Sequence, residues 1–543
     1  MTDRKHISGN IVDILNKKIY SGIIHLKGAY IESIVADPTA TGPFLLPGFI
    51  DAHVHIESSM LTPSQFARLA VVHGTVSTVS DPHEIGNVMG VAGVQYMVDN
   101  GKQVPFKFNF GAPSCVPATT FETAGATITA ADIENLLQQD HIKYVAEMMN
   151  WPGVLAKDPA VMEKLTLAQK YNKPVDGHAP GLMGEQAIQY IQAGMSTDHE
   201  CFTREEALGK LQAGMKILIR EGSAAKNFEA IISLLPDYAS QIMFCSDDKH
   251  PDSLVAGHIN QLASRAVAKG FNVFDVLQAA CINPILHYKL DVGYLQPGQP
   301  ADFIAVEDLS DFRVLQTYIN GTLVAEQGST LIPFTESQIV NRFNTSFKKP
   351  EDFKVAAHGN KLQVIEAIDG QLITNKLEVH TKVTDGQILP DIENDILKIT
   401  VVNRYAEAKP AIAFIKNFGL KTGAIASSVA HDSHNIIAVG CDDASICQAV
   451  NLLIEAKGGI SAVMTQNKMI LPLPIAGIMS GEDGYTVASQ YEQLDGMAKK
   501  MGSQLQSPFM TLSFMALLVI PSLKLSDLGL FDGSTFKFTP VSS

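Results

Sequence analysis

The feature that most constrains the fold is an alternation of short apolar runs with longer amphipathic stretches between residues 47 and 300. Eight of the apolar runs are strand-like and end in polar residues, and stretches such as SQFARLAVVHG lie between them. Strands that alternate with helices of about 10 to 15 residues indicate βαβ units and a parallel sheet. Eight such units over roughly 250 residues predict a TIM-like (β/α)8 barrel. An open doubly wound sheet is the alternative, but no GxGxxG follows the first run.

The segments that flank this barrel have a different texture. Residues 1–46 and 301–348 contain short β-branched runs separated by turn residues. This pattern predicts a small β-sandwich domain built from both flanks of the barrel, which itself spans 47–300. Residues 349–543 mix strand-like and helical patterns after the stretch FKKPEDF and predict an additional C-terminal α+β domain. The expected fold class is therefore α/β.

Composition narrows the range of partners. The chain has 41 Lys+Arg against 56 Asp+Glu, a net charge of −15, which disfavours nucleic acid and anionic membranes as partners. The stretch from Phe514 to Leu525 is the most apolar, but it is too short to span a bilayer and contains a proline. No secretory signal pattern is found at the N-terminus, and the six cysteines form no CxxC pair. We therefore expect a cytoplasmic protein with reduced thiols.

The polar residues that close the strand-like runs are rich in metal ligands. His53 and His55 stand at i and i+2, so in a strand both side chains point to the same side. Later runs end with further ligands, Glu147, His178, His199 and Asp247. A single histidine of this kind is more often a satisfied polar residue near a loop. Six nitrogen and carboxylate ligands at one barrel mouth instead suit a pair of divalent first-row metals.

Several segments at these positions resemble one family, the adenine deaminases of the amidohydrolase superfamily of metal-dependent hydrolases. The superfamily-level motifs are LLPGFIDAHVHIE and GYLQPGQPADF. The motifs that are similar to adenine deaminases in particular are SDPHEIGNV, AEMMNWPGV, DGHAPGL, DHE, IREGSAAKN and CSDD. The resemblance extends over the whole chain and implies hydrolysis of adenine to hypoxanthine and ammonia in purine salvage.

The resemblance also implies a ligand set. His53, His55 and Asp247 would bind one metal, and His178 and His199 the other. Glu147 would bridge the two, although many relatives use a carboxylated lysine, for which Lys143 is the alternative here. The implied cofactors are two divalent transition metals per subunit, Mn²⁺ or Fe²⁺, with Zn²⁺ as a further option, because such ligands accept each of them.

Deamination needs a nucleophile and groups that move protons, and the resemblance suggests candidates for both. Asp247 is the expected general base, with its neighbour Asp248 as the alternative. Glu200 and Glu221 are candidates for the acid that protonates the ring, although both could instead orient a histidine. The residues expected to contact the purine or to brace these groups are His83, Glu84, Arg220 and Ser223.

Other interpretations remain open at this point. The same ligands could serve another amidohydrolase reaction, on a cyclic amide or a different heterocyclic amine, because fold alone does not fix the substrate. A protein of another class, a metal-free scaffold barrel, is disfavoured by the intact ligand set. His431 and His434 lie in a loop that either binds a further metal or caps the barrel mouth or a subunit contact. The family resemblance suggests a homodimer or a larger homo-oligomer.

Overall fold

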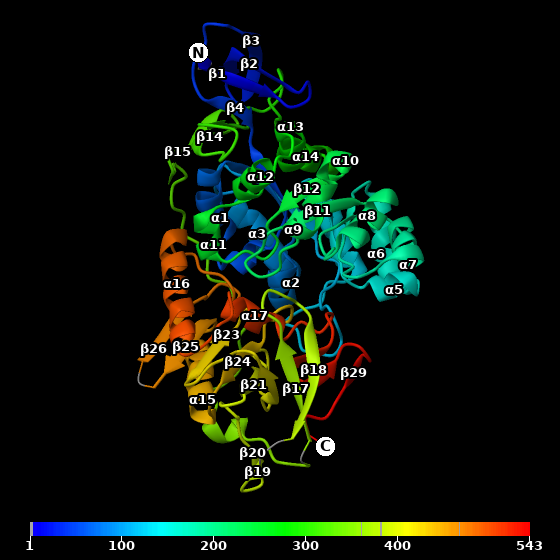
Figure 1. Cartoon of the computed structure of the whole chain (residues 1–543), viewed down its shortest axis with the longest axis vertical. Coiled ribbons are helices and arrows are strands. Elements are labelled where there is room, and N and C mark those ends of the chain that lie inside the picture. Colours follow the sequence, from blue (N-terminus) through cyan, green and yellow to red (C-terminus); the bar gives the residue numbers. More distant parts are fainter. Residues whose placement is uncertain (1–3, 360, 381–382, 466, 543) are drawn as a thin grey trace.

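The computed structural model describes residues 4–359, 361–380, 383–465 and 467–542. Three regions follow one another along the long axis of the molecule (Figure 1). A small sheet lies at one end, the barrel lies in the middle, and the C-terminal region lies at the other end. A single hydrophobic core cluster includes residues from the barrel and from the C-terminal region, such as Leu61 and Ile478. The C-terminal region is therefore packed onto the barrel.

The barrel consists of eight parallel strands in sequence order, as predicted. The backbone N–H of Asp247 donates to the carbonyl of His53 at 2.9 Å, and a parallel bridge joins Val54 to Asp247, so the last strand returns to the first. The strands are β5 (Phe49–Val54), β6 (Thr75–Ser80), β7 (Lys107–Ala112), β8 (Ile142–Met148), β9 (Val175–Gly177), β10 (Met195–Asp198), β11 (Lys216–Arg220) and β12 (Ile242–Cys245).

Helices follow these strands and surround the barrel, as the alternating pattern predicts. They are α1 (Pro63–Ala70), α2 (His83–Met89), α3 (Val91–Gly101), α4 (Ala130–Leu137), α5 (Trp151–Leu155), α6 (Pro159–Lys170), α7 (Gly184–Gln192), α8 (Arg204–Gln212), α9 (Phe228–Ile231), α10 (Leu235–Tyr238), α11 (Pro251–Ala256), α12 (Ile259–Ala268), α13 (Val273–Leu277) and α14 (Asn283–Tyr288).

The two flanks of the barrel join in one eight-stranded sheet. The central contact is the antiparallel pairing of β4 (Phe44–Pro47) with β13 (Phe303–Val306). One of these strands comes before the barrel in the sequence and the other comes after it. The other strands are β1 (Arg4–Asp13), β2 (Lys18–Lys27), β3 (Tyr30–Ala36), β14 (Val314–Ile319), β15 (Thr322–Glu326) and β16 (Ser329–Thr330). Their apolar side chains form a separate small core. The prediction that both flanks contribute to one small β domain is confirmed.

The C-terminal region is built on a third eight-stranded sheet, in which β17 and β22 are the one parallel pair among the described strands. Its strands are β17 (Lys361–Ala367), β18 (Thr374–His380), β21 (Ile396–Val402), β22 (Ala411–Lys416), β23 (Ala424–Ser427), β24 (Ile436–Gly440), β25 (Gly459–Met464) and β26 (Asn467–Pro472). Smaller strands complete the region, β19 (Val383–Thr384), β20 (Gln387–Ile388), β27 (Leu523–Ser526), β28 (Gly529–Asp532) and β29 (Lys537–Phe538). Its helices are α15 (Asp443–Ala456), α16 (Gly484–Lys500) and α17 (Pro508–Phe514).

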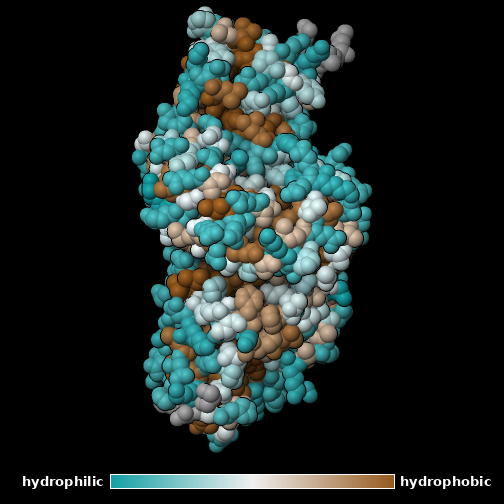
Figure 2. All heavy atoms as spheres, turned by 90° about the vertical axis from the view of Figure 1, so that its right-hand side faces the viewer, coloured by the Kyte–Doolittle hydropathy of each residue, from teal (hydrophilic) through white to brown (hydrophobic). Residues whose placement is uncertain are grey.

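Helix α17 lies between the C-terminal sheet and the barrel (Figure 1). The apolar stretch identified in the sequence runs from Phe514, the last residue of this helix, to Leu525 in strand β27, and most of its side chains are buried, as expected for core. In the described part of the chain, no helix has the length and apolarity needed to cross a membrane. Figure 2 shows a largely hydrophilic face, with hydrophobic patches next to the small sheet and others scattered over the middle and the opposite end.

Candidate active site

The six predicted ligands converge at the C-terminal ends of the barrel strands. His53 lies in β5 and His55 just beyond it, Glu147 lies near the end of β8, and Asp247 follows β12 by two residues. His178 and His199 come directly after β9 and β10. All six are less than 8% exposed. Parallel strands that close into a barrel bring their carboxyl ends to one mouth, so ligands up to 194 positions apart become neighbours.

One group of ligand atoms is formed by the first and last strands. The Nε2 atoms of His53 and His55 lie 3.2 Å apart. Asp247 Oδ1 lies 3.5 Å from the former and 3.3 Å from the latter. The backbone of Asp247 is left-handed, with φ of 56°, a conformation that asparagine and aspartate tolerate better than most residues.

Glu147 connects this group with a second one. Its Oε1 lies 3.4 Å from His55 Nε2, whereas its Oε2 lies 2.7 Å from His178 Nδ1 and 3.3 Å from His199 Nε2. The ring of His199 also stacks on that of His53, with centroids 4.1 Å apart. One carboxylate thus faces two sets of histidine nitrogens with its two oxygens, which is the arrangement required of a bridging ligand.

The protonation pattern shows that these residues fit metal cations. His55 Nδ1 lies 3.2 Å from the carbonyl oxygen of Asp81 and therefore carries the ring proton when the imidazole is neutral. Its Nε2 then turns a lone pair toward another imidazole nitrogen and toward the carboxylate oxygens of Glu147 and Asp247. Lone pairs and anionic oxygens in one buried cluster repel one another unless cations lie between them. A metal-bound histidine typically donates its other ring N–H to a carbonyl or carboxylate oxygen, as His55 does to the carbonyl of Asp81.

Lys143 is not close to these ligands. It lies in the first part of β8 and is only partly buried. Glu147 comes four positions later in the strand, about 13 Å away at the usual rise of a strand. The geometry therefore favours Glu147 over a carboxylated Lys143 as the bridging group.

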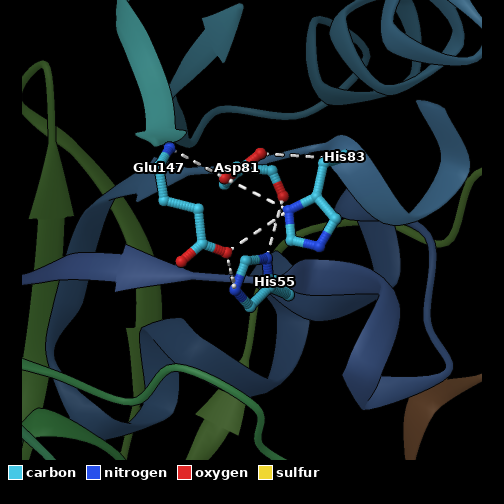
Figure 3. A group of neighbouring side chains, drawn as sticks. All are labelled: His55, Asp81, His83 and Glu147. Atoms are coloured by element: carbon cyan, nitrogen blue, oxygen red, sulfur yellow. Dashed lines mark hydrogen bonds and ion pairs between the residues drawn. The ribbon is translucent and has the colours of Figure 1, made fainter. Parts of the chain in front are cut away.

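Asp81 supports this centre and was not among the residues predicted from sequence (Figure 3). Its Oδ2 lies 3.2 Å from His83 Nδ1 and accepts a hydrogen bond from the backbone N–H of Glu147 at 3.3 Å. His83 Nδ1 is in turn 3.5 Å from Glu147 Oε1. His83, at the start of α2, thus lies beside the ligands as expected, and Asp81 orients it.

Arg220 forms ion pairs with two of the carboxylates that are candidates for proton transfer, Glu200 and Asp247. Its guanidinium pairs with both oxygens of Glu200, with Nη2 to Oε2 at 2.8 Å, and Nη1 lies 2.6 Å from Asp247 Oδ2. Burial opposes ionisation of Glu200, but Arg220 together with His178 and His199 outweighs it and lowers the pKa of Glu200 to about 2. Burial likewise opposes ionisation of Asp247, and Arg220 holds the pKa of that carboxyl well below its usual range. Both groups are therefore anionic at neutral pH.

A cavity opens above the ligands and has two sides. The barrel side contains five of the six ligands, all but His53, together with further polar residues and one methionine, His83, Glu84, Met149, Glu200 and Asp248. The opposite side is made by residues of the C-terminal region, Leu372, His431, Asp432, Phe514 and Leu517. The three apolar residues of this second side carried no signal in the sequence, since nothing distinguishes them from ordinary core residues.

Four of the predicted site residues are not among those that line this cavity: His53, Arg220, Glu221 and Ser223. Glu221 forms an ion pair with Arg265 of α12 at 2.6 Å, because it follows Arg220 at the end of β11 and points to the other side of the strand. The Ser223 hydroxyl accepts a hydrogen bond from the backbone N–H of His250, and the Ser223 N–H donates to the carbonyl of Asp248. Ser223 thus supports the Asp248 backbone, and Arg220 braces Glu200 and Asp247 rather than Glu221.

The loop with His431 and His434 caps the barrel mouth. His431 Nδ1 lies 2.5 Å from Glu84 Oε1, and His434 Nε2 pairs with Glu84 Oε2. The backbone N–H of Ala430 donates to His434 Nδ1 at 3.3 Å, so the ring proton of a neutral His434 lies on Nε2. A metal at that nitrogen would have to displace this proton. The hydrogen-bonding pattern therefore favours the interpretation of a polar cap over that of a further metal site.

Comparison with known proteins agrees with this geometry. Residues 44–324 match a family model described as the amidohydrolase family, so the barrel and its ligand cluster define a member of that class of hydrolases. Residues 371–537 match a second model, the adenine deaminase C-terminal domain. Within the amidohydrolases, the chain belongs to the adenine deaminase family.

Curated relatives extend over both regions. An adenine deaminase of Sulfurovum sp. (strain NBC37-1) is 55% identical over 98% of this chain and 98% of its own. Those of Salinibacter ruber and Borreliella burgdorferi are 53% and 49% identical, again over 98% of both chains. The similarity therefore includes the C-terminal side of the cavity as well as the metal ligands.

Proposed function

We propose that this protein hydrolyses adenine to hypoxanthine and ammonia with the help of two divalent transition metals, Mn²⁺ or Fe²⁺, with Zn²⁺ as the alternative. The observation that carries the proposal is Glu147, whose two oxygens face separate sets of histidine nitrogens in a buried cluster. His53, His55 and Asp247 would hold one metal, and His178 and His199 the other. When bound, such a metal pair acidifies water and so supplies a strong nucleophile near neutral pH.

Asp247 is positioned to act as the general base. Its Oδ1 faces the histidine cluster, while its Oδ2 is held by Arg220 at 2.6 Å. An anionic carboxylate in this place accepts a proton from the attacking water and returns it to the departing amine, which leaves as ammonia. Arg220 keeps this group ionised and fixes its orientation. Asp248 also lines the cavity, but its Oδ1 is engaged by a hydrogen bond from Ser58 at 2.6 Å.

Glu200 is the better placed candidate for moving a proton to the ring. It lines the cavity, and its Oε1 lies 3.4 Å from His199 Nε2 and 3.6 Å from His178 Nδ1. As an anion held by Arg220, it takes up a proton as the nucleophile forms and passes it to the ring nitrogen next to the reacting carbon. Glu221 is paired with Arg265 outside the cavity, so this role is not assigned to it.

The cellular setting belongs to the same proposal. The six cysteines are buried and unpaired in the described residues, as reduced thiols of a cytoplasmic protein would be. The acidic net charge gives no support to nucleic acid as a partner. A homodimer or larger homo-oligomer is proposed because apolar side chains of the small sheet, such as Tyr30 and Val35, are about half exposed.

The test is ammonia release and the ultraviolet change with adenine, adenosine and cytosine, on protein purified with added Mn²⁺. Rapid turnover of adenine alone supports the proposal. If metal is bound and all three compounds are left unchanged, the substrate is instead a cyclic amide or another heterocyclic amine. A metal-free scaffold would hold no metal, and His53→Asn would then change only its stability.

A further inference from the structure

The C-terminal region does more than cover the barrel, because residues that it places at the cavity include buried polar atoms without a hydrogen-bond partner, among them Nε2 of His431. His431 is 3% exposed and lines the cavity from the C-terminal side. Among the residues that the structure describes, its Nε2 has no hydrogen-bond partner, and Asp248 Oδ1 at 3.9 Å is too far to be one. A buried polar atom without a partner is costly, so such atoms at a cavity wall commonly serve a ligand.

The ring of His431 is held in place from two directions. Its Nδ1 pairs with Glu84 Oε1 at 2.5 Å, and Glu84 is fixed in turn through its other oxygen by His434. On its flat side, the ring stacks on Phe514 of α17, with centroids 5.2 Å apart and planes inclined by 29°. Because Nδ1 and the ring face are both occupied, Nε2 is the atom left for a bound molecule.

The charges around His431 determine what Nε2 offers. Glu84 and Asp248 face the ring, and the carboxylate of Asp432 lies next to it in the chain and lines the same cavity. Three carboxylates favour the imidazolium form, in which both ring nitrogens carry protons and donate. The complementary group on a purine is an unprotonated ring nitrogen.

The position of the chemistry selects that nitrogen. The carbon that loses the amine has to face the ligand cluster and Asp247 on the barrel side. In the six-membered ring of adenine, the atom opposite this carbon is N3. The flat faces of the ring would then lie among apolar side chains of the cavity, Met149, Leu372, Phe514 and Leu517.

We propose that His431 is a substrate-binding residue that donates a hydrogen bond from Nε2 to N3 of adenine, so that the C-terminal region recognises the edge of the base remote from the amine. This assignment rests on the proposed adenine deamination. It gives the match to the adenine deaminase C-terminal domain a specific role in substrate recognition.

The experiment measures binding of adenine, 3-deazaadenine and 1-deazaadenine by calorimetry to the Mn²⁺-loaded protein, in the wild type, His431→Leu and His434→Gln. In the wild type, loss of N3 should weaken binding by about 10- to 100-fold, as expected for one hydrogen bond to a charged donor. His431→Leu should bind adenine and 3-deazaadenine with affinities that differ by no more than about threefold. Its preference for adenine over 1-deazaadenine should be the same as that of the wild type.

His434→Gln is the matched control, because it breaks the contact with the same Glu84 on the side that does not line the cavity. It should keep the 3-deazaadenine ratio of the wild type. If His434→Gln loses this ratio as His431→Leu does, His431 has only a structural role, and the proposal is overturned. An unchanged ratio in His431→Leu also overturns it. His431→Asn, too short to reach N3, replaces the leucine variant if that one does not fold.

Failure of the function itself would look different. A wild type that binds metal and adenine but releases no ammonia contradicts the deamination, while the binding ratios still decide the role of His431. A wild type that binds no adenine contradicts both.

Discussion

The two sides of the cavity are built on different principles. The barrel side is dense in imidazoles and carboxylates, which are fixed by the ends of parallel strands and by buried partners such as Arg220 and Asp81. The C-terminal side is largely apolar and presents one histidine with a free nitrogen. The difference indicates that the barrel side carries the catalytic groups, whereas the C-terminal side recognises the base.

The largest expected effect lies at the centre of the barrel side. Glu147→Gln keeps the shape of the side chain but removes the charge shared between the two histidine groups. It should lower the occupancy of at least one metal and reduce turnover by about three orders of magnitude or more, with the fold intact. Metal analysis and adenine turnover on the purified variant give the answer.

Lys143→Met is the control for this variant and should have normal metal content and turnover. Two bound metals and a normal rate in Glu147→Gln would assign the bridge to another group, Lys143 first.

A second prediction compares a buried arginine with an exposed one. Arg220→Met leaves the buried carboxylates of Glu200 and Asp247 without their cation and should cost about 3 to 5 kcal/mol in the free energy of unfolding. Arg265 is 39% exposed on its side chain and pairs with Glu221 and Glu229, so Arg265→Met should cost at most about 1 kcal/mol. Denaturant titrations of both variants measure the difference. Equal losses would show that the buried network contributes nothing beyond a surface pair.

A third prediction concerns the C-terminal side. Lys524 is fully buried, and its ammonium donates to the carbonyls of Leu372 at 2.5 Å and Phe514 at 2.9 Å, two residues of the cavity wall. Lys524→Met should loosen this wall and raise KM for adenine roughly 3- to 10-fold, with kcat within about twofold of the wild type. Lys376→Met, which removes a partly exposed pair with Asp532, is the control. A loss of kcat with unchanged KM would contradict the division between the two sides.

The smallest effect concerns a carboxyl group near the junction of the two regions. Burial, reinforced by Asp432, raises the pKa of Glu122 from 4.5 to about 8. The folded protein therefore holds this proton more tightly than the unfolded chain, and the stability gained from it is lost as the pH rises from about 4.5 toward 8. The glutamine in Glu122→Gln does not titrate. The melting temperature of this variant minus that of the wild type should therefore increase by a few degrees as the pH rises over this interval. A constant difference between pH 5 and 8 would show that Glu122 does not titrate there.

The barrel side could be predicted from sequence because its residues obey local rules. The period of the apolar runs gives parallel strands, and parallel strands place their final residues at one mouth. His53 and His55 share a side because they are two residues apart in a strand. The same alternation explains Glu221, which follows the inward-facing Arg220 and therefore lies outside the cavity.

The C-terminal side could not be predicted in this way. Phe514 and Leu372 reach the cavity through the packing of a separate domain, and an apolar residue that lines a cavity looks like one in a core. Asp81 was missed for another reason, since its role depends on contacts with His83 and the backbone of Glu147 that no spacing rule reveals. Tertiary contacts, rather than periodicity, determine these positions.

The most direct test is a metal titration of chelator-treated protein, with bound Mn²⁺ and hypoxanthine formation followed together from zero to four equivalents. The account predicts that binding and activity both saturate at two equivalents, in the wild type and in His434→Gln alike. A third tightly bound equivalent that disappears in His434→Gln would place a metal at Glu84, His431 and His434, and would contradict the separation between a metal-binding barrel side and a substrate-binding C-terminal side.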